Sequence, residues 1–354
     1  MIMKVSDILS HRLVNQQIAE TKFKKPAEVV GYMGAIQAQD YGMAKWAIGL
    51  RLPGSTDADI EKAFNDGLIL RTHMLRPTWH FVCPKDIKWI LELSAPRVHA
   101  FNALYYRKEG LDSKTLKRCN DLLGKTLEGC QELNRAEIKT VLEGAKIKTE
   151  GLRMALILMH AELDAVICSG AKKGKQFSYA LLDEKAPGAK IYDKEEALAK
   201  LTKLYFTSRG PATVQDYAWW SGLTIKSARE GIATLGKQFA RETIDGKEYI
   251  YKENRLTDIS LLQKTFLMPD FDEYSISYKD RTALLNTKSY VAWNEEINIT
   301  RQHILIIDGV RAGTWNKNAK NKKPAVDTVV FDTTKAKEAA AAKAVKKYLA
   351  FASE

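Results

Sequence analysis

Two glutamines separated by one residue, in the sequence Gln37-Ala38-Gln39, are a pair of amides that could take part in chemistry together. An amide cannot act as a general base near neutral pH, but its carbonyl oxygen accepts hydrogen bonds and its NH2 group donates them. The pair could therefore hold one water molecule against an electrophilic carbon. This suits a reaction whose leaving group already carries a positive charge, because no proton then has to be supplied.

The spacing of the glutamines limits their local structure. Residues i and i+2 of a continuous helix point to nearly opposite sides. Both amides therefore reach one pocket only if the helix that begins at Pro26 ends near Gln37. Asp40 and Gly42 follow directly and are suited to break it. The alternative is that one glutamine caps the helix and the other is solvated, with no role in chemistry.

A predicted strand pair, 68–73 and 78–83, carries a second group of candidates. Its basic side chains could contact phosphates; they are Arg71, His73, Arg76 and His80. Successive strand residues alternate between faces, so Arg71 and His73 share one face. The alternative is that both histidines are packed or surface residues.

The same local pattern recurs three times: helix, turn, helix, and then two strands joined by a basic or glycine-containing turn. The most regular copy is expected over 210–252, with Thr224 as an N-cap and Asp245-Gly246 as the hairpin turn. The others are expected over 133–183 and 26–83. Two helices followed by a hairpin are typical of a winged helix.

The turn of the 133–183 copy, between Gly170 and Gln176, is strongly basic. It contains Lys172, Lys173 and Lys175. It is not a phosphate loop, because only three residues separate its glycines and Gln176 stands where that motif needs Ser or Thr. We interpret it as a basic wing tip that contacts DNA.

Composition limits the class of protein. The 354 residues include 55 Lys+Arg and 43 Asp+Glu, a net charge of +12, and 45% are hydrophobic. This is a folded protein of several modules whose charge favours polyanionic partners. No apolar run is long enough to span a membrane, and no secretory signal is visible. The four cysteines form no CxxC pair, so we expect neither disulfides nor zinc, and a reducing cytoplasm.

The remaining sections are a connecting segment and a C-terminal module. Over 85–130 we expect helices whose core face includes Leu116, Cys119, Leu123, Leu127 and Cys130. After about 265 the pattern favours strands, with a hairpin around Asp308-Gly309, and 335–350 is expected to be a terminal helix. Asp270, Asp272 and Arg281 could form a carboxylate site, but we favour an ion-pair cluster that supports this module.

We therefore predict an α+β fold, mostly α, with three tandem winged-helix modules and a C-terminal module containing β-strands. The expected domains are winged helix 1 (1–84), connecting helices (85–132), winged helix 2 (133–190), winged helix 3 (191–260) and the C-terminal module with its Lys-rich tail (261–354). Three basic winged helices favour duplex DNA as the partner. Protein docking is the alternative, because winged helices also serve as protein-docking modules.

The chain resembles the bacterial winged-helix DNA glycosylases of the AlkZ/YcaQ kind. The matching stretches, in the family's order, are 34–40, 71–82, 208–223, 268–274 with 278–281, and 307–315. The family's catalytic signature is Gln-x-Gln, with a sister branch that has Gln-x-Asp. Gln37 and Gln39 place this chain in the Gln-x-Gln branch.

The resemblance implies a C-shaped arrangement around a DNA channel and a monofunctional glycosylase that acts on alkylated purines, in some members at interstrand crosslinks. An N7-alkylguanine is already cationic, so its base departs neutral and two positioning amides suffice. By this resemblance Gln37 and Gln39 are catalytic, and the basic residues named above bind DNA or the lesion. We expect no metal or other cofactor, no membrane partner, a monomer, and a cytoplasmic, nucleoid-associated protein. The competing hypothesis is a non-catalytic duplex-binding protein or transcription regulator.

Overall fold

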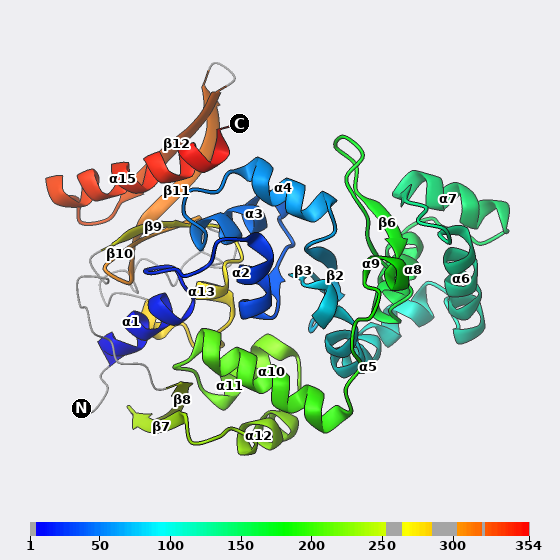
Figure 1. Cartoon of the computed structure of the whole chain (residues 1–354), viewed down its shortest axis with the longest axis horizontal. Helices are drawn as coiled ribbons and strands as arrows, with labels where there is room; N and C mark the ends of the chain where they lie inside the picture. The colour runs from blue at the N-terminus through cyan, green and yellow to red at the C-terminus, as the bar shows by residue number, and fades with distance from the viewer. Residues whose placement is uncertain (1–4, 253–263, 285–302, 321–322, 354) are drawn as a thin grey trace. The chain divides into compact units, whose positions relative to one another are not determined.

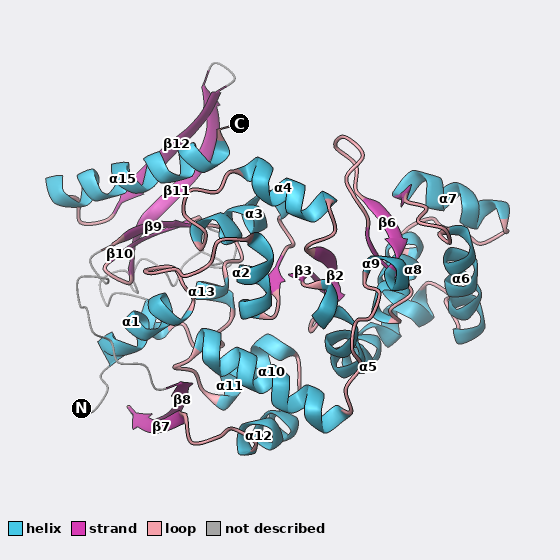
Figure 2. Ribbon diagram, in the orientation of Figure 1, coloured by secondary structure: helices cyan, strands magenta, loops and turns pink. Residues whose placement is uncertain are grey.

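The computed structural model describes residues 5–252, 264–284, 303–320 and 323–353 (Figure 1). Helices dominate, and the strands form small sheets (Figure 2). The chain folds into two compact units: unit 1 comprises Met1–Glu61, Ala199–Trp220 and Thr224–Glu354, and unit 2 comprises Lys62–Leu198 and Ser221–Leu223. The predicted modules were continuous sections, whereas each unit is assembled from separate ones. Among the described residues, no helix is long and apolar enough to cross a membrane.

Unit 1 contains both ends of the described chain and its longest strands. Its elements are α1 (Val5–Asn15), α2 (Pro26–Met33), β1 (Ile36–Gln37), α3 (Tyr41–Leu50), α11 (Val214–Ser221), α12 (Ile225–Ala233), β7 (Phe239–Ile244), β8 (Lys247–Lys252), β9 (Thr265–Met268), α13 (Glu273–Ile276), the 3-10 helix η2 (Thr282–Leu284), β10 (Ile304–Ile307), β11 (Val310–Lys320), β12 (Lys323–Val330) and α15 (Lys335–Ala352). The unit boundaries fall within α4 (Asp57–Asn65) and α10 (Lys194–Arg209), and at the end of α11.

The elements predicted over 210–252 are confirmed. The Thr224 hydroxyl accepts a hydrogen bond from the Ser227 N–H at 3.0 Å and so caps α12. Strands β7 and β8 pair antiparallel, with Ile244 opposite Lys247. Asp245 and Gly246 both have positive φ, 48° and 73°, as the tight hairpin turn requires.

The C-terminal strands of unit 1 form one sheet in the order β12-β11-β10-β9. Helix α15 lies along this sheet (Figure 1). The hairpin at Asp308-Gly309 is confirmed, but β11 continues to Lys320 and pairs with β12, which the sequence did not predict. Close packing joins α15 to α3: a Cβ on Gly49 would lie 2.4 Å from the Phe351 ring, so only glycine fits there.

Unit 2 is built around a helical core. Its elements are β2 (Leu70–Met74), β3 (Thr78–Val82), α5 (Pro84–Lys108), α6 (Ser113–Thr126), β4 (Leu133–Asn134), α7 (Arg135–Gly144), α8 (Arg153–Leu163), β5 (Ile167–Ser169), β6 (Ser178–Leu181) and α9 (Leu182–Lys185). The predicted capping box is confirmed, because Asn134 accepts hydrogen bonds from the first turn of α7 while Glu137 accepts one from the Asn134 N–H.

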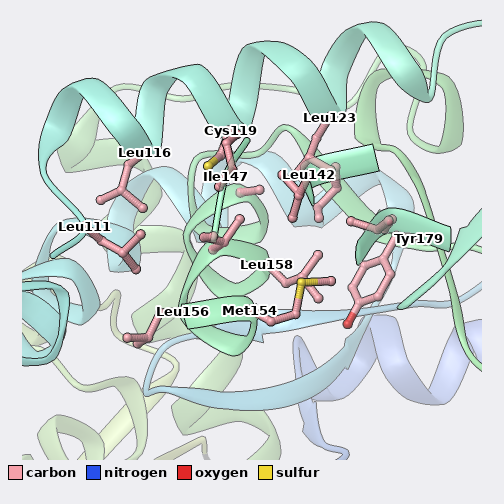
Figure 3. Packing of buried hydrophobic residues seen from close by; sticks show 14 of the residues in the cluster. Leu111, Leu116, Cys119, Leu123, Leu142, Ile147, Met154, Leu156, Leu158 and Tyr179 are labelled. Atoms are coloured by element: carbon pink, nitrogen blue, oxygen red, sulfur yellow. The ribbon is translucent and has the colours of Figure 1, made fainter. Parts of the chain in front are cut away.

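The core of unit 2 contains most of the predicted helical face. Leu116, Cys119, Leu123 and Leu127 are buried in one cluster with residues of α7 and α8 (Figure 3). Cys130 was expected to continue this face, and that prediction is wrong. Helix α6 ends at Thr126, and Cys130 is exposed with φ of 60°, because the chain has already turned out of the helix.

Candidate functional site

The segment that carries the glutamines is extended, and the helix before it is shorter than expected. Helix α2 ends at Met33, because Gly34 adopts a φ of 74° that other residues rarely accept. The prediction that helix continues to about Gln37 is therefore wrong. Ile36 and Ala38 are fully buried, Gln37 is 7% exposed and Gln39 is exposed. Ile36 and Gln37 form strand β1, and residues i and i+2 of an extended chain share a face.

The glutamine side chains make no hydrogen bond in the part of the chain that the structure describes, although Gln37 is only 7% exposed. The Gln37 backbone N–H donates to Glu273. Asp40, which follows Gln39, is committed instead to capping α3, because its carboxylate accepts a hydrogen bond from the Met43 N–H at 3.0 Å. The alternative that a glutamine caps the helix is therefore not what the structure shows.

A buried ion pair between Arg209 and Glu273 fixes this segment within unit 1. Both side chains have no exposed surface, and Arg209 Nη2 lies 2.9 Å from Glu273 Oε2. The arginine also donates to the carbonyl oxygens of Met33 and Ala35, at 2.7 and 2.8 Å. The Gln37 N–H donates to Glu273 Oε1 at 2.9 Å. One charged pair thus holds the backbone on both sides of the turn at Gly34.

Glu273 accepts several hydrogen bonds in addition to its ion pair with Arg209. It accepts from Trp220 Nε1 at 3.0 Å and from the Ser277 hydroxyl. Neither Arg209 nor Glu273 was recognised as functional in the sequence, although both lie in stretches that match the family. Their local sequence does not distinguish them, because Glu273 directly follows Asp272 and Arg209 lies between Ser208 and Gly210.

A second buried pair corrects the expected ion-pair cluster. Asp272 accepts two hydrogen bonds from Arg51, at 2.8 and 2.9 Å, and both side chains are fully buried. Arg281 does not join them: its Nε donates to the Ser275 carbonyl oxygen. The sequence correctly favoured a structural ion pair over a carboxylate site for Asp272, but it assigned the wrong arginine.

Asp270 lies close to the end of the glutamine segment. Its Oδ1 is 3.6 Å from His303 Nε2, and the His303 ring stacks on Trp315. Burial raises the pKa of Asp270, and the carboxylate of Asp40 raises it further, whereas His303 and Lys317 act in the opposite direction. The carboxylates of Asp40 and Asp270 therefore lie close enough to interact, with His303 and Lys317 near Asp270 as basic neighbours.

The shifted pKa of Asp270 gives a prediction of stability against pH. A raised carboxyl pKa favours the folded state fully below the ordinary value of about 3.9, and this stabilisation is lost as pH rises through the folded value. Asp270→Asn removes the buried charge, so it should raise the Tm near pH 7, with the difference shrinking towards about pH 3.5. Thermal unfolding at several pH values measures both effects.

Asp280→Asn is the matched control, because it should behave in the opposite way. Burial would raise the pKa of Asp280, but hydrogen bonds from Lys247 and Thr282 outweigh it and hold the pKa at about 2. Its stabilisation exists above the ordinary pKa and is lost as pH falls towards the folded value. Asp280→Asn should therefore lower the Tm near pH 7. A shift of the same sign in both variants would contradict this assignment.

The predicted basic residues of β2 and β3 are mostly buried in unit 2. His73 Nδ1 contacts Glu162 Oε2, and both side chains are buried. His80 has no exposed surface, and its Nδ1 lies 2.9 Å from the Thr78 carbonyl oxygen. Burial favours the interpretation of both as packed histidines over phosphate contacts. Arg76 is half-buried on the turn between the strands, beside Gly222.

Arg71 and Lys175, which are far apart in the sequence, line one pocket of about 570 Å³ in unit 2. Arg135 and Lys139 of α7 add two more cations, and none of the described lining residues is acidic. Trp79 and Phe177 form aromatic walls. The Arg71 guanidinium lies 4.2 Å from the centre of the Trp79 ring and 4.8 Å from that of Phe177.

The other two lysines of the predicted wing tip, Lys172 and Lys173, contact neighbouring protein groups. Lys173 Nζ donates to the Glu132 carbonyl oxygen at 2.6 Å and lies 4.0 Å from Glu137. Lys172 Nζ lies 5.9 Å from the centre of the Phe177 ring, and its N–H donates to Asn65. Of the three, Lys175 is therefore the lysine that combines exposure with a place in the cationic pocket.

Comparison with known proteins gives a consistent result. A family model described as "DNA glycosylase AlkZ-like" matches residues 30–351. A curated relative, "Interstrand DNA cross-link repair glycosylase" from Streptomyces sahachiroi, is 23% identical over 280 residues, which cover 75% of each chain. The solved structure of Streptomyces sahachiroi DNA glycosylase AlkZ has the same fold, with a TM-score of 0.81 over 99% of this chain and 97% of that one, at 18% identity.

Proposed function

Because this chain belongs to the AlkZ-like DNA glycosylase family, we propose that it hydrolyses the N-glycosidic bond of N7-alkylated purines in duplex DNA. The observation that carries the proposal is the placement of Gln37 and Gln39. The Arg209–Glu273 pair fixes the backbone at Met33, Ala35 and Gln37, and neither glutamine side-chain amide has a hydrogen-bond partner among the described residues. Pre-organised polar groups of this kind lower a barrier by positioning a reactant.

In the proposed reaction the cationic base leaves as a neutral molecule, and its sugar becomes oxocarbenium-like at C1′. A glutamine carbonyl accepts from the attacking water while an amide N–H donates to it, so the water is oriented towards C1′. When the C1′–O bond forms, the water loses one proton to the solvent, because an amide cannot hold it. The carboxylates of Asp40 and Asp270 add negative potential, which favours the developing positive charge on the sugar. An amide nitrogen is too weak a nucleophile to form a covalent intermediate, so the glutamines support a monofunctional enzyme.

The relative named for interstrand cross-link repair extends the proposed substrates to crosslinked purines. The test is free-base release from duplexes that carry N7-methylguanine, a bulky N7 adduct or an interstrand crosslink, with an unmodified duplex as control. We expect release from at least one modified duplex, leaving an abasic site in an unbroken strand. Tight binding to all four duplexes without base release would instead support the non-catalytic DNA-binding protein.

Duplex binding should depend strongly on salt, and Lys175 should contribute to that dependence. Each neutralised phosphate steepens the slope of log K against log salt by about 0.9. Lys175→Ala is therefore expected to reduce the slope by about 0.9 and to weaken binding by a similar factor on unrelated sequences. Fluorescence anisotropy at several salt concentrations measures it.

Lys117→Ala is the matched control, because it removes the same charge from unit 2. Lys117 is exposed and paired with Asp121 on α6, so its loss should leave the slope nearly unchanged. If the slope of log K against log salt is the same for the wild type and Lys175→Ala, the cationic pocket does not contact DNA.

A further inference from the structure

A group of three side chains of metal-ligating types lies in unit 2. It consists of His99 on α5, His160 on α8 and Asp164, which directly follows α8. His99 Nε2 is 2.9 Å from Asp164 Oδ1, and His160 Nδ1 is 3.3 Å from Asp164 Oδ2. One ligand atom from each residue lies within 4.8 Å of the other two.

The donor set and its spacing suit a transition-metal ion. Two imidazoles and one carboxylate are a common set for Zn²⁺ and its neighbours, and a fourth position remains for water. With bonds of about 2.0–2.1 Å, ligand atoms of a tetrahedral site lie about 3.3 Å apart. The two histidine–carboxylate distances, 2.9 and 3.3 Å, are near this value, and the three ligand atoms lie within 4.8 Å of one another, so the third separation would have to shorten when a metal binds. His160 and Asp164 are four residues apart, so one face of the helix end presents both.

Further contacts orient these ligands. His99 Nδ1 lies 3.2 Å from the Tyr106 hydroxyl, and Asn120 Nδ2 donates to Asp164 Oδ2 at 2.7 Å. Partners of this kind fix the ring orientation and the carboxylate of a metal site.

We propose that His99, His160 and Asp164 bind one Zn²⁺-class metal ion, which ties α5 to the end of α8. The site belongs to unit 2, whereas the glutamines belong to unit 1. The proposal does not depend on glycosylase activity. Sequence spacing could not reveal it, because only the fold brings His99 beside the other two ligands.

The test uses the full chain, stripped of metal by a chelator that is then removed. Titration with Zn²⁺ followed by calorimetry should give one site per chain, and the Tm should rise with Zn²⁺ concentration. Co²⁺ should give visible absorption bands of a low-coordinate site. His99→Gln and His160→Gln should each weaken binding by more than about 100-fold, since even second-shell changes commonly cost 10- to 100-fold.

Two variants control for other metal ligands, and one for misfolding. His303→Gln alters a histidine that contacts a single carboxylate, and Cys130→Ser removes the exposed thiol; both should bind Zn²⁺ like the wild type. Asp164→Asn retains hydrogen-bonding groups but loses the charged ligand, so it should fold, by circular dichroism, and bind weakly. No saturable site, unchanged binding in both histidine variants, or loss of binding in Cys130→Ser would overturn the proposal.

Discussion

Gln37→Ala and Gln39→Ala are each expected to slow excision of an N7-alkylguanine by about 100-fold or more, because each removes a positioned polar group from the reacting centre. DNA affinity should stay nearly unchanged. The double variant should lose less than the product of the single losses, since both amides hold one water. Single-turnover excision and duplex binding, measured in parallel, give both quantities.

Residual excision should remain in the double variant, because the cationic lesion loses its base slowly without help. Neither amide gains or loses a proton in the ordinary pH range. The excision rate should therefore depend on pH in the same way in the wild type and in these variants. Gln238→Ala is the matched control: it makes the same change at an exposed glutamine of unit 1. Excision at the wild-type rate in both single variants and the double would exclude the glutamines from the mechanism. A parallel loss of DNA binding would make them contact or folding residues.

Arg209→Met is expected to lower the free energy of unfolding by about 3–5 kcal/mol, because it leaves the Glu273 carboxylate buried without a counter-charge. It also removes the donors to the carbonyl oxygens of Met33 and Ala35. Adding Glu273→Gln should restore part of the stability, since the amide is neutral and retains an oxygen that can accept the Gln37 N–H. Denaturant unfolding of the wild type, both single variants and the double variant measures the coupling.

Lys62→Met provides the control for an exposed ion pair. Lys62 pairs with Asp66 on the surface of α4, so its loss should cost no more than about 1 kcal/mol. In the Arg209→Met/Glu273→Gln variant, excision should remain impaired under conditions where the protein is folded, because Met33 and Ala35 are no longer held. Full excision by that folded variant would show that the pair serves stability alone.

Local chemistry in the sequence determined much of the secondary structure. The capping box of Asn134 and Glu137, the N-cap Thr224 and the hairpin turns at Asp245-Gly246 and Asp308-Gly309 were all found where predicted. Each of these signals acts between residues a few positions apart, so it can be recognised without knowing the path of the chain. The helical core face through Leu116, Cys119 and Leu123 was predictable for the same reason.

The candidate site could be predicted only in part from the sequence. The Gln37-Ala38-Gln39 motif could be identified, but its extended backbone could not be predicted. Gly34 can adopt several backbone conformations, and only packing in the folded chain selects one of them. The basic stretch at 71–82 was also identified. Burial then separated Arg71, which lines the cationic pocket, from His73 and His80, which are packed.

Many helices and turns, the family motif and the positive charge could be identified from the sequence without the structure. The tertiary structure alone decided which distant side chains meet: Arg209 with Glu273, Arg51 with Asp272, and His99 with His160 and Asp164. The physical reason is the range of the interactions. Caps and turns are satisfied by neighbours in the chain, whereas a buried charge or a metal ligand must find partners that only the folded path of the backbone brings within bonding distance.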